Sequence, residues 1–299
     1  MWGVLQAILL HFCHNNAKVT ERNQIVHLHK RRKKMSTIAV QNTVETKDQY
    51  SLAKILGIWA IVALPMPVVI FVIAPALIAR VNMHPTILIW LLIIGGYVWQ
   101  FIVSLFLIYQ DIGTLRLTAV RERVWLQKPR DPQTNKSKSK LFWWLIPTAL
   151  FVLLIEMGIG EYIDSAVASL FPGLLTLPAS IDIEQIIIPE FIGAWWLLGI
   201  AIVNSVFNYF LGEELLFRGV LLPKMRGVFG KWDWVANAVL FGLLHLDSPL
   251  RIPKIMISTL AYTWPSRRFR SIWFAIILHG IESLIVIGAV LSVVTGSAF

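Results

Sequence analysis

Apolar blocks about as long as a bilayer is thick recur along this 299-residue chain. A helix needs about 20 apolar residues to cross the hydrocarbon core, and only helices and closed barrels satisfy their backbone groups there. Alternating strand patterns of about ten residues, which are typical of membrane barrels, do not occur. The sequence therefore predicts an all-α, polytopic membrane protein with about seven transmembrane helices. The expected spans are residues 52–78, 86–109, 141–158, 191–211, 234–246, 252–263 and 272–294.

The charges between these blocks predict an orientation. Only 15% of the residues are charged, and the net charge is +10; soluble proteins carry about 25% charged residues. The excess Lys and Arg lies in loops beside apolar blocks, as the positive-inside rule expects, so we do not expect a nucleic-acid partner. Basic segments occur in the N-terminal tail and at 113–140, 218–231 and 264–270. They alternate with acidic or neutral loops at 81–85, 159–190 and 247–251 and the C-terminus.

This alternation predicts an integral, multi-pass protein of the cell membrane with a cytoplasmic N-terminus. Residues 1–51 are expected to be a basic cytoplasmic tail beside anionic lipid. Residues 52–158 are expected to hold the N-terminal transmembrane helices and the basic loop 113–140, of which 115–126 is predicted to lie on the membrane surface. A third region covers residues 190–295. Two points stay open: whether one of the two short blocks, 234–246 or 252–263, belongs to a re-entrant pair, and whether the chain begins at Met1 or Met35.

Two carboxylates and an arginine stand inside an otherwise apolar region at Glu213, Glu214 and Arg218. A charged side chain at the centre of a membrane helix costs about 2.5–3.5 kcal/mol on insertion scales, so such residues usually have a function. Glu214 and Arg218 are four residues apart, and on a helix they can pair. Glu213 is turned about 100° from Glu214 and must face another group.

Two further polar clusters follow. Phe241 and His245 are four residues apart, and so are His279 and Ser283. Any one cluster alone is more often structural, but each carries a desolvation cost that a shared polar cavity would relieve. A carboxylate and two imidazoles in one cavity suffice to activate water and to stabilise an oxyanion. The His-Glu-x-x-His and Gly-x-Ser-x-Gly motifs of other hydrolases are absent.

The motifs Glu213-Glu214-x-x-x-Arg218, Phe241-x-x-x-His245 and His279-x-x-x-Ser283 resemble those of one protease family. It is the CPBP (CAAX protease and bacteriocin-processing, or Abi) family of intramembrane endopeptidases, related to the type II CAAX prenyl protease. The resemblance covers about residues 190–295, which would then be the protease domain. The family's third motif usually ends in Asn or Asp, so Ser283 is a departure that puts activity in doubt.

The resemblance implies a role for each site residue. Glu213 would be the general base, His245 would help to hold the water or a metal, and His279, with Ser283 in the last position, would stabilise the oxyanion. Glu214, Arg218 and Phe241 would give structural support. The mechanism is expected to be glutamate-dependent or metallo, and the candidate ligands for a divalent metal such as zinc are Glu213, His245 and His279.

We therefore expect an intramembrane endopeptidase that hydrolyses a peptide bond of a membrane-associated, prenylated or leader-bearing substrate. Its partners would be that peptide or protein and the lipid bilayer. The alternative is a catalytically impaired relative that acts as a membrane scaffold, a binding partner or a small transporter. Ser283 motivates the alternative, because its hydroxyl is shorter than an Asn amide. Neither hypothesis predicts an oligomeric state.

Overall fold

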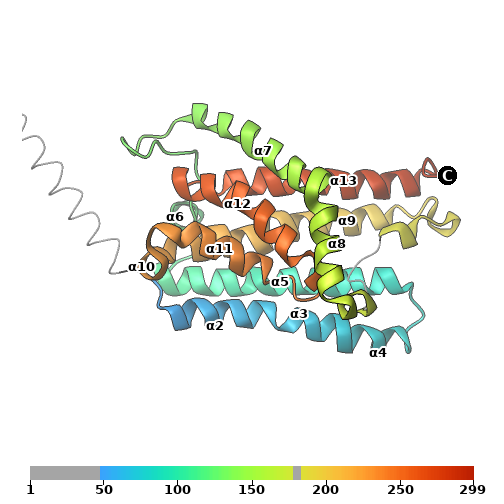
Figure 1. The fold of residues 1–299 in the computed structure, drawn as a ribbon. Coiled ribbons are helices and arrows are strands. Elements are labelled where there is room, and N and C mark those ends of the chain that lie inside the picture. The colour runs from blue at the N-terminus through green and yellow to red at the C-terminus, as the bar shows by residue number, and fades with distance from the viewer. Residues whose placement is uncertain (1–47, 178–182) are drawn as a thin grey trace, which may run out of the picture. The chain divides into compact units, whose positions relative to one another are not determined.

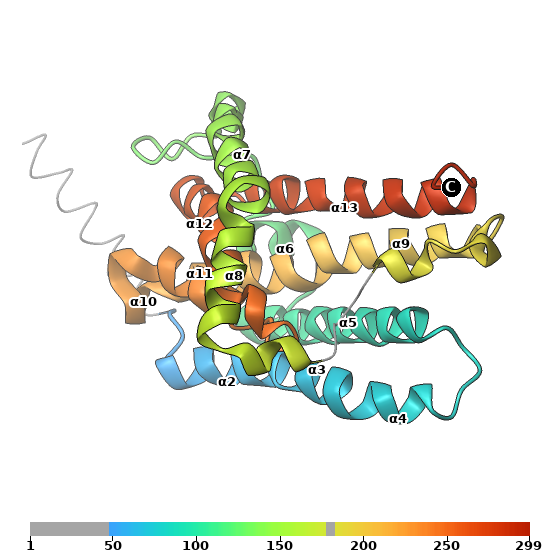
Figure 2. The same cartoon turned by 45° about the vertical axis from the view of Figure 1, so that its right-hand side comes forward.

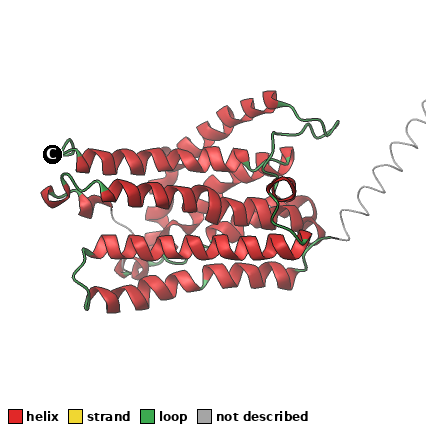
Figure 3. Cartoon of the chain, turned by 180° about the vertical axis from the view of Figure 1, so that it is seen from behind, coloured by secondary structure: helices red, strands yellow, loops and turns green. Residues whose placement is uncertain are grey.

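The computed structural model describes residues 48–177 and 183–299, and the regular elements of this part of the chain are all helices (Figure 3). The chain divides into two units, residues 1–49 and residues 50–299, and the following paragraphs concern the second unit. The expected tail and the alternative start Met35 lie outside the described residues, apart from the last few residues of the tail.

Five helical segments of the described residues are long and apolar enough to cross a membrane, so the helical membrane fold is confirmed. They are Leu52–Ile78, Pro85–Ile112, Ser139–Leu170, Trp196–Lys224 and Trp273–Val294. The expected number of about seven is not reached. The two short apolar blocks form α11 (Asp233–Gly242) and α12 (Ile252–Phe269) instead. At 1.5 Å per residue α11 is about 15 Å long, roughly half the hydrocarbon thickness, and α12 carries Lys and Arg at both ends.

Most of the spans run side by side in this unit (Figures 1 and 2). They contain α2 (Leu52–Ala63), α5 (Pro85–Ile112), α9 (Trp196–Val206) and α13 (Trp273–Val294). A buried apolar cluster joins three of them through Trp90, Leu197 and Val290. Continuous apolar composition around these helices allows contacts on several faces, as burial in lipid and protein requires.

The first span is not one regular helix. Ser51 begins α2, because its side chain accepts a hydrogen bond from the Lys54 backbone N–H at 3.2 Å. The helix continues as α3 (Pro65–Val68), a π-helical turn (Val69–Ile73) and α4 (Ala74–Ile78). The segments α3 and α4 contain prolines. Because proline has no N–H to donate, these residues account for the interruption of the α-helical hydrogen-bond pattern.

The third span bends, and its second half crosses the other spans. It comprises η2 (Ser139–Trp144), α7 (Leu145–Leu153), a π-helical turn (Leu154–Ile159) and α8 (Gly160–Leu170), so it extends beyond the expected end at residue 158. In two views α8 crosses in front of the long helices (Figures 1 and 2). Lys254 of α12 attaches it through ion pairs with Asp164 at 3.0 Å and Glu156 at 3.6 Å.

Part of the basic loop packs against the helix that carries the two carboxylates. Its helix α6 (Leu117–Arg123) ends beside Val124, which has no exposed surface. Arg123 pairs with Asp111 and donates to the carbonyls of Gly219 and Val220, each at 3.2 Å. Val124 at the C-terminal end of 115–126 is thus packed against protein, and the position of this segment at the membrane surface stays a prediction.

Candidate active site

Glu213 and Glu214 lie between two π-helical turns, η7 (Phe207–Gly212) and η8 (Leu215–Leu221). Such turns are rare and occur frequently at functional sites. Gly212 allows α5 to approach closely here, because a Cβ at this position would lie 3.0 Å from the Tyr97 carbonyl oxygen of α5. It would also lie 2.6 Å from the Phe207 carbonyl oxygen of its own turn. The helix that carries the carboxylates is thus pressed against α5 at the site itself.

The expected ion pair between Glu214 and Arg218 is present at 3.0 Å, and neither side chain has exposed surface. The Arg218 Nε and Nη2 atoms also donate to the Thr263 hydroxyl, at 3.4 and 3.3 Å. The guanidinium carbon lies 4.0 Å from the ring centre of Phe241 and 4.8 Å from that of Tyr262. A carboxylate, a hydroxyl and two aromatic faces therefore surround this buried cation, each of them a favourable partner.

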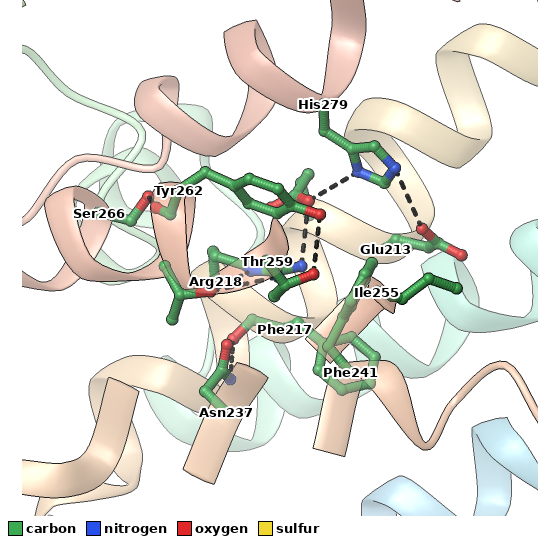
Figure 4. Close-up of polar contacts among 12 residues, drawn as sticks. Glu213, Phe217, Arg218, Asn237, Phe241, Ile255, Thr259, Tyr262, Ser266 and His279 are labelled. Carbon is green, nitrogen blue, oxygen red and sulfur yellow. Dashed lines mark hydrogen bonds and ion pairs between the residues drawn. The ribbon is translucent and has the colours of Figure 1, made fainter. Parts of the chain in front are cut away.

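Glu213 faces both imidazoles, as its expected orientation away from Glu214 requires. Its side chain is buried. One carboxylate oxygen lies 3.9 Å from His245 Nε2, and the other lies 3.9 Å from His279 Nε2, the pair drawn in Figure 4. These separations exceed a direct hydrogen bond, and polar contacts of this length are commonly bridged by one water molecule.

The other ring nitrogen of each histidine has its own acceptor. His245 Nδ1 lies 3.0 Å from the Phe241 carbonyl oxygen, and His279 Nδ1 lies 2.9 Å from Glu214 Oε1. Both oxygens accept only, so each Nδ1 carries the proton and each Nε2 is directed toward Glu213. In this state Nε2 accepts a proton or a hydrogen bond, and it becomes a donor when the ring is protonated.

Aromatic packing holds the imidazoles in place. His279 stacks on Tyr262, with ring centres 5.7 Å apart at 17°, and meets the edge of Tyr209 at 4.7 Å. Phe241 packs against both histidine rings.

His245 lies in a turn after α11, which ends at Gly242 rather than near residue 246 as expected. The expected proximity of Phe241 and His245 survives, because the turn remains tight: the His245 N–H donates to the Gly242 carbonyl at 3.1 Å.

Ser283 does not join this group. Its hydroxyl donates to the Gly280 carbonyl of the same helix at 2.6 Å, and it is not among the residues that line the cavity at Glu213. Glu282 lines that cavity instead. Both residues lie within about one turn of His279, so spacing alone could not decide between them. The expectation that Ser283 belongs to the site therefore has no support in the geometry.

The cavity has a volume of about 510 Å³, which is in the usual range for a ligand site. It contains Glu213, His245 and His279 and extends to Trp90 and Ile186. Three amide side chains that no motif marks also line it: Gln100, Asn204 and Asn208. In the sequence, each of these amides is a polar residue inside an apolar span, which could have marked it as a candidate. Polar residues inside apolar spans occur elsewhere in the chain too, so this feature alone does not identify the three.

A metal site was one expectation for Glu213, His245 and His279. Within residues 48–177 and 183–299, no group of three His, Cys, Asp or Glu side chains is placed to hold a metal ion. Both Nε2 atoms are 3.9 Å from Glu213, and the contact of His279 Nδ1 with Glu214 is of the kind that metal-bound histidines also make. A metal ion at these residues therefore stays a prediction, and the mechanism below uses only the side chains and water.

Comparison with known proteins supports the recognition made from the motifs. Residues 191–285 match the family model described as "Type II CAAX prenyl endopeptidase Rce1-like". The match covers about a third of the chain, and this region is similar to that family. The matched residues include Glu213, His245 and His279. At the level of the family, the Rce1-like region and the five apolar helices indicate a multi-pass intramembrane protease of the CAAX type. No curated protein and no solved structure shows a significant match to the chain.

Proposed function

We propose that this protein is a glutamate-dependent intramembrane endopeptidase. The observation that carries the proposal is the position of the Glu213 carboxylate, with one oxygen 3.9 Å from His245 Nε2 and the other 3.9 Å from His279 Nε2 in a buried cavity. A water molecule between these groups would have an acceptor on each side. The substrate is a peptide bond in a membrane-associated protein, with a prenylated CAAX-type C-terminus as the first class to test.

The reaction follows from the positions of these groups. Glu213 takes a proton from the water, and the water oxygen forms a bond to the scissile carbonyl carbon. His245 Nε2 accepts a hydrogen bond from the hydrogen that stays on the water oxygen, and so orients the nucleophile. The negative charge that develops on the carbonyl oxygen receives a hydrogen bond from Nε2 of protonated His279. When the C–N bond breaks, Glu213 returns its proton to the amine that leaves.

Replacement of Glu213 tests this mechanism. The purified protein is incubated with a farnesylated peptide that ends in a CAAX sequence, and the products are identified by mass spectrometry. Glu213→Gln keeps the size of the side chain but removes the base, so cleavage should fall by about 10²–10⁴-fold without loss of thermal stability. The matched control is Glu161→Gln, which changes an exposed glutamate and should leave cleavage unchanged. Full activity of a folded Glu213→Gln protein would contradict the mechanism.

Two alternatives make different predictions in the same assay. A metalloprotease would lose activity with a chelator and recover it with zinc, whereas the mechanism above continues in the chelator. A non-catalytic scaffold, which the hydrogen bond of Ser283 to its own helix favours, would keep its cellular phenotype in Glu213→Gln and lose it when Arg218→Ala unfolds the protein. Proteins that accumulate uncleaved in cells with Glu213→Gln would identify the natural substrate.

A further inference from the structure

The cavity at Glu213 also holds three amides that the proposed reaction does not use. Gln100 comes from α5, Asn204 from α9 and Asn208 from the π-helical turn η7. Gln100 is 1% exposed and Asn204 is 5% exposed. The side-chain oxygens of all three are buried and have no hydrogen-bond partner among the described residues. An unpaired buried polar group is costly, so three of them on one cavity point to a polar occupant.

The spacing of these groups fits an extended peptide. Asn204 and Asn208 are four residues apart, which is about 6 Å along a helix. Glu213 follows five residues later, across the π-helical turn η7, and lines the same cavity. In an extended strand the peptide groups on one side recur every second residue, about 6.6–6.8 Å. Successive groups on this helix face can therefore meet successive peptide units of one extended chain, and the last of them is the proposed base.

The third amide faces the cavity from another helix. Gln100 lies about one turn beyond Tyr97 on α5, at the point where Gly212 lets the two helices approach. The same cavity is also lined by the apolar side chains of Trp90 and Ile186. A peptide in this space would have amide partners for its main chain and an apolar surface for its side chains.

We propose that Gln100, Asn204 and Asn208 form a subsite that hydrogen-bonds the main chain of an extended peptide and leads it to Glu213. The inference rests on the proposed function, which supplies a peptide as the occupant. Each amide both donates and accepts, so it can pair with an N–H and a C=O of the substrate. Peptide groups that leave water inside a membrane protein need such partners. This mode resembles strand addition, with side-chain amides in place of a strand edge.

Binding to the Glu213→Gln protein tests the subsite without turnover. The probe is the farnesylated CAAX peptide, together with analogues in which one non-scissile amide N–H at a time is replaced by an ester oxygen. Asn204→Leu and Asn208→Leu should each weaken binding about five- to tenfold, the effect of losing one hydrogen bond. One of the ester analogues should bind the Glu213→Gln protein more weakly than the unmodified peptide does. When the amide side chain that contacts this position is also replaced by leucine, the affinity for that analogue should not fall further.

The matched control is Ser205→Ala on the same helix. Its hydroxyl donates to the Ala201 carbonyl at 2.8 Å, and it does not line the cavity, so binding should not change. With Glu213 present, the leucine variants should raise KM about five- to tenfold and leave kcat nearly constant. The ester analogues alter only the peptide, so they test the contact even where a leucine variant does not fold.

The outcomes separate this inference from the proposed function. Equal binding of the peptide and all its ester analogues to the Glu213→Gln protein would overturn the subsite, as would unchanged binding to folded Asn204→Leu and Asn208→Leu variants. Failure to bind the peptide at all would also overturn it. If the peptide binds with the expected amide dependence but the unsubstituted protein does not cleave it, the subsite stands and the proposed hydrolysis fails.

Discussion

At the scale of single residues, Arg218 is a cation whose side chain has no exposed surface, and burial of such a charge is costly unless it is paired. Its carboxylate partner Glu214 also contacts His279 Nδ1. Glu214 therefore links the buried arginine to the imidazole that faces Glu213. The support that Arg218 gives to the site is thus indirect: it holds Glu214, and Glu214 holds the ring of His279. Positioning through such an outer partner is common for histidines at functional sites.

Loss of Arg218 should destabilise the protein strongly. Arg218→Met leaves Glu214 as a buried charge without its cation, and breaking a buried pair on one side costs about 3–5 kcal/mol. Thermal or denaturant unfolding in detergent measures the change. The double variant Glu214→Gln/Arg218→Met should recover part of the loss, because no lone charge remains. Arg80→Met is the control at an exposed arginine. Equal stability of the Arg218→Met and Arg80→Met proteins would contradict the argument.

At the scale of elements, the site depends on how closely α5 meets the turn η7 (Phe207–Gly212). Gly212 permits that distance, since an added Cβ would lie 3.0 Å from the backbone carbonyl oxygen of Tyr97 in α5 rather than from the end of a flexible side chain. Backbone cannot move aside as the end of a side chain can. The position of Glu213 relative to α5 is therefore fixed by helix packing and not only by its own helix.

Gly212→Ala should consequently disturb both stability and activity. Overpacking of this kind costs about 1–3 kcal/mol, and displacement of α5 should also lower cleavage of the peptide. Gly57→Ala in α2 is the matched control, because nothing lies within 4 Å of an added Cβ there; it should be neutral or up to about 1 kcal/mol stabilising. Unfolding midpoints and cleavage rates of both variants test the prediction, and similar behaviour of the two would refute it.

Features that depend on spacing within one helix could be predicted from the sequence. Glu214 and Arg218, four residues apart, are paired as expected, and Glu213 faces another way. Two kinds of feature could not be predicted from the sequence: where a helix ends, and which residue of one helical turn faces a neighbouring helix. Spacing did not separate Ser283 from Glu282. The amide of Asn204 belongs to no motif, and its place in the cavity depends on contacts between distant helices.

At the scale of the whole molecule, the five spans found among the described residues preserve the alternation of loop charge that was predicted with seven spans. Residues 113–138 and 225–272 are rich in Lys and Arg, whereas residues 171–195 contain acidic residues and no Lys or Arg. The helices α10 (Arg226–Phe229), α11 and α12 fall within the second basic segment, so counting five spans in place of seven leaves the predicted orientation unchanged. A cytoplasmic N-terminus remains the prediction.

Labelling of introduced cysteines tests this orientation. The chain has one cysteine, Cys13, so Cys13→Ser provides a background without thiols. Gly173→Cys should react with an impermeant maleimide in intact cells, whereas Ser137→Cys should react only after the membrane is opened. The two positions flank the third span (Ser139–Leu170). Reaction of both from the same side would show that this segment does not cross the membrane.

The π-helical turn before Glu213 has a consequence for deletions, because it determines whether a chain shorter by one residue can still form this site. A π-helical turn holds one residue more than an α-helical turn, so a shorter chain can keep the same downstream register by returning to α-helical geometry. Removal of Phe210 from η7 should therefore preserve more cleavage than removal of Ile202 from α9, where no spare residue absorbs the loss and the two parts of the helix turn by about 100°. Comparison of cleavage by the two deletion variants measures this tolerance, and equal loss would show that the extra residue is not spare. The helix thus contains a point at which the gene can lose a codon while both glutamates keep their places.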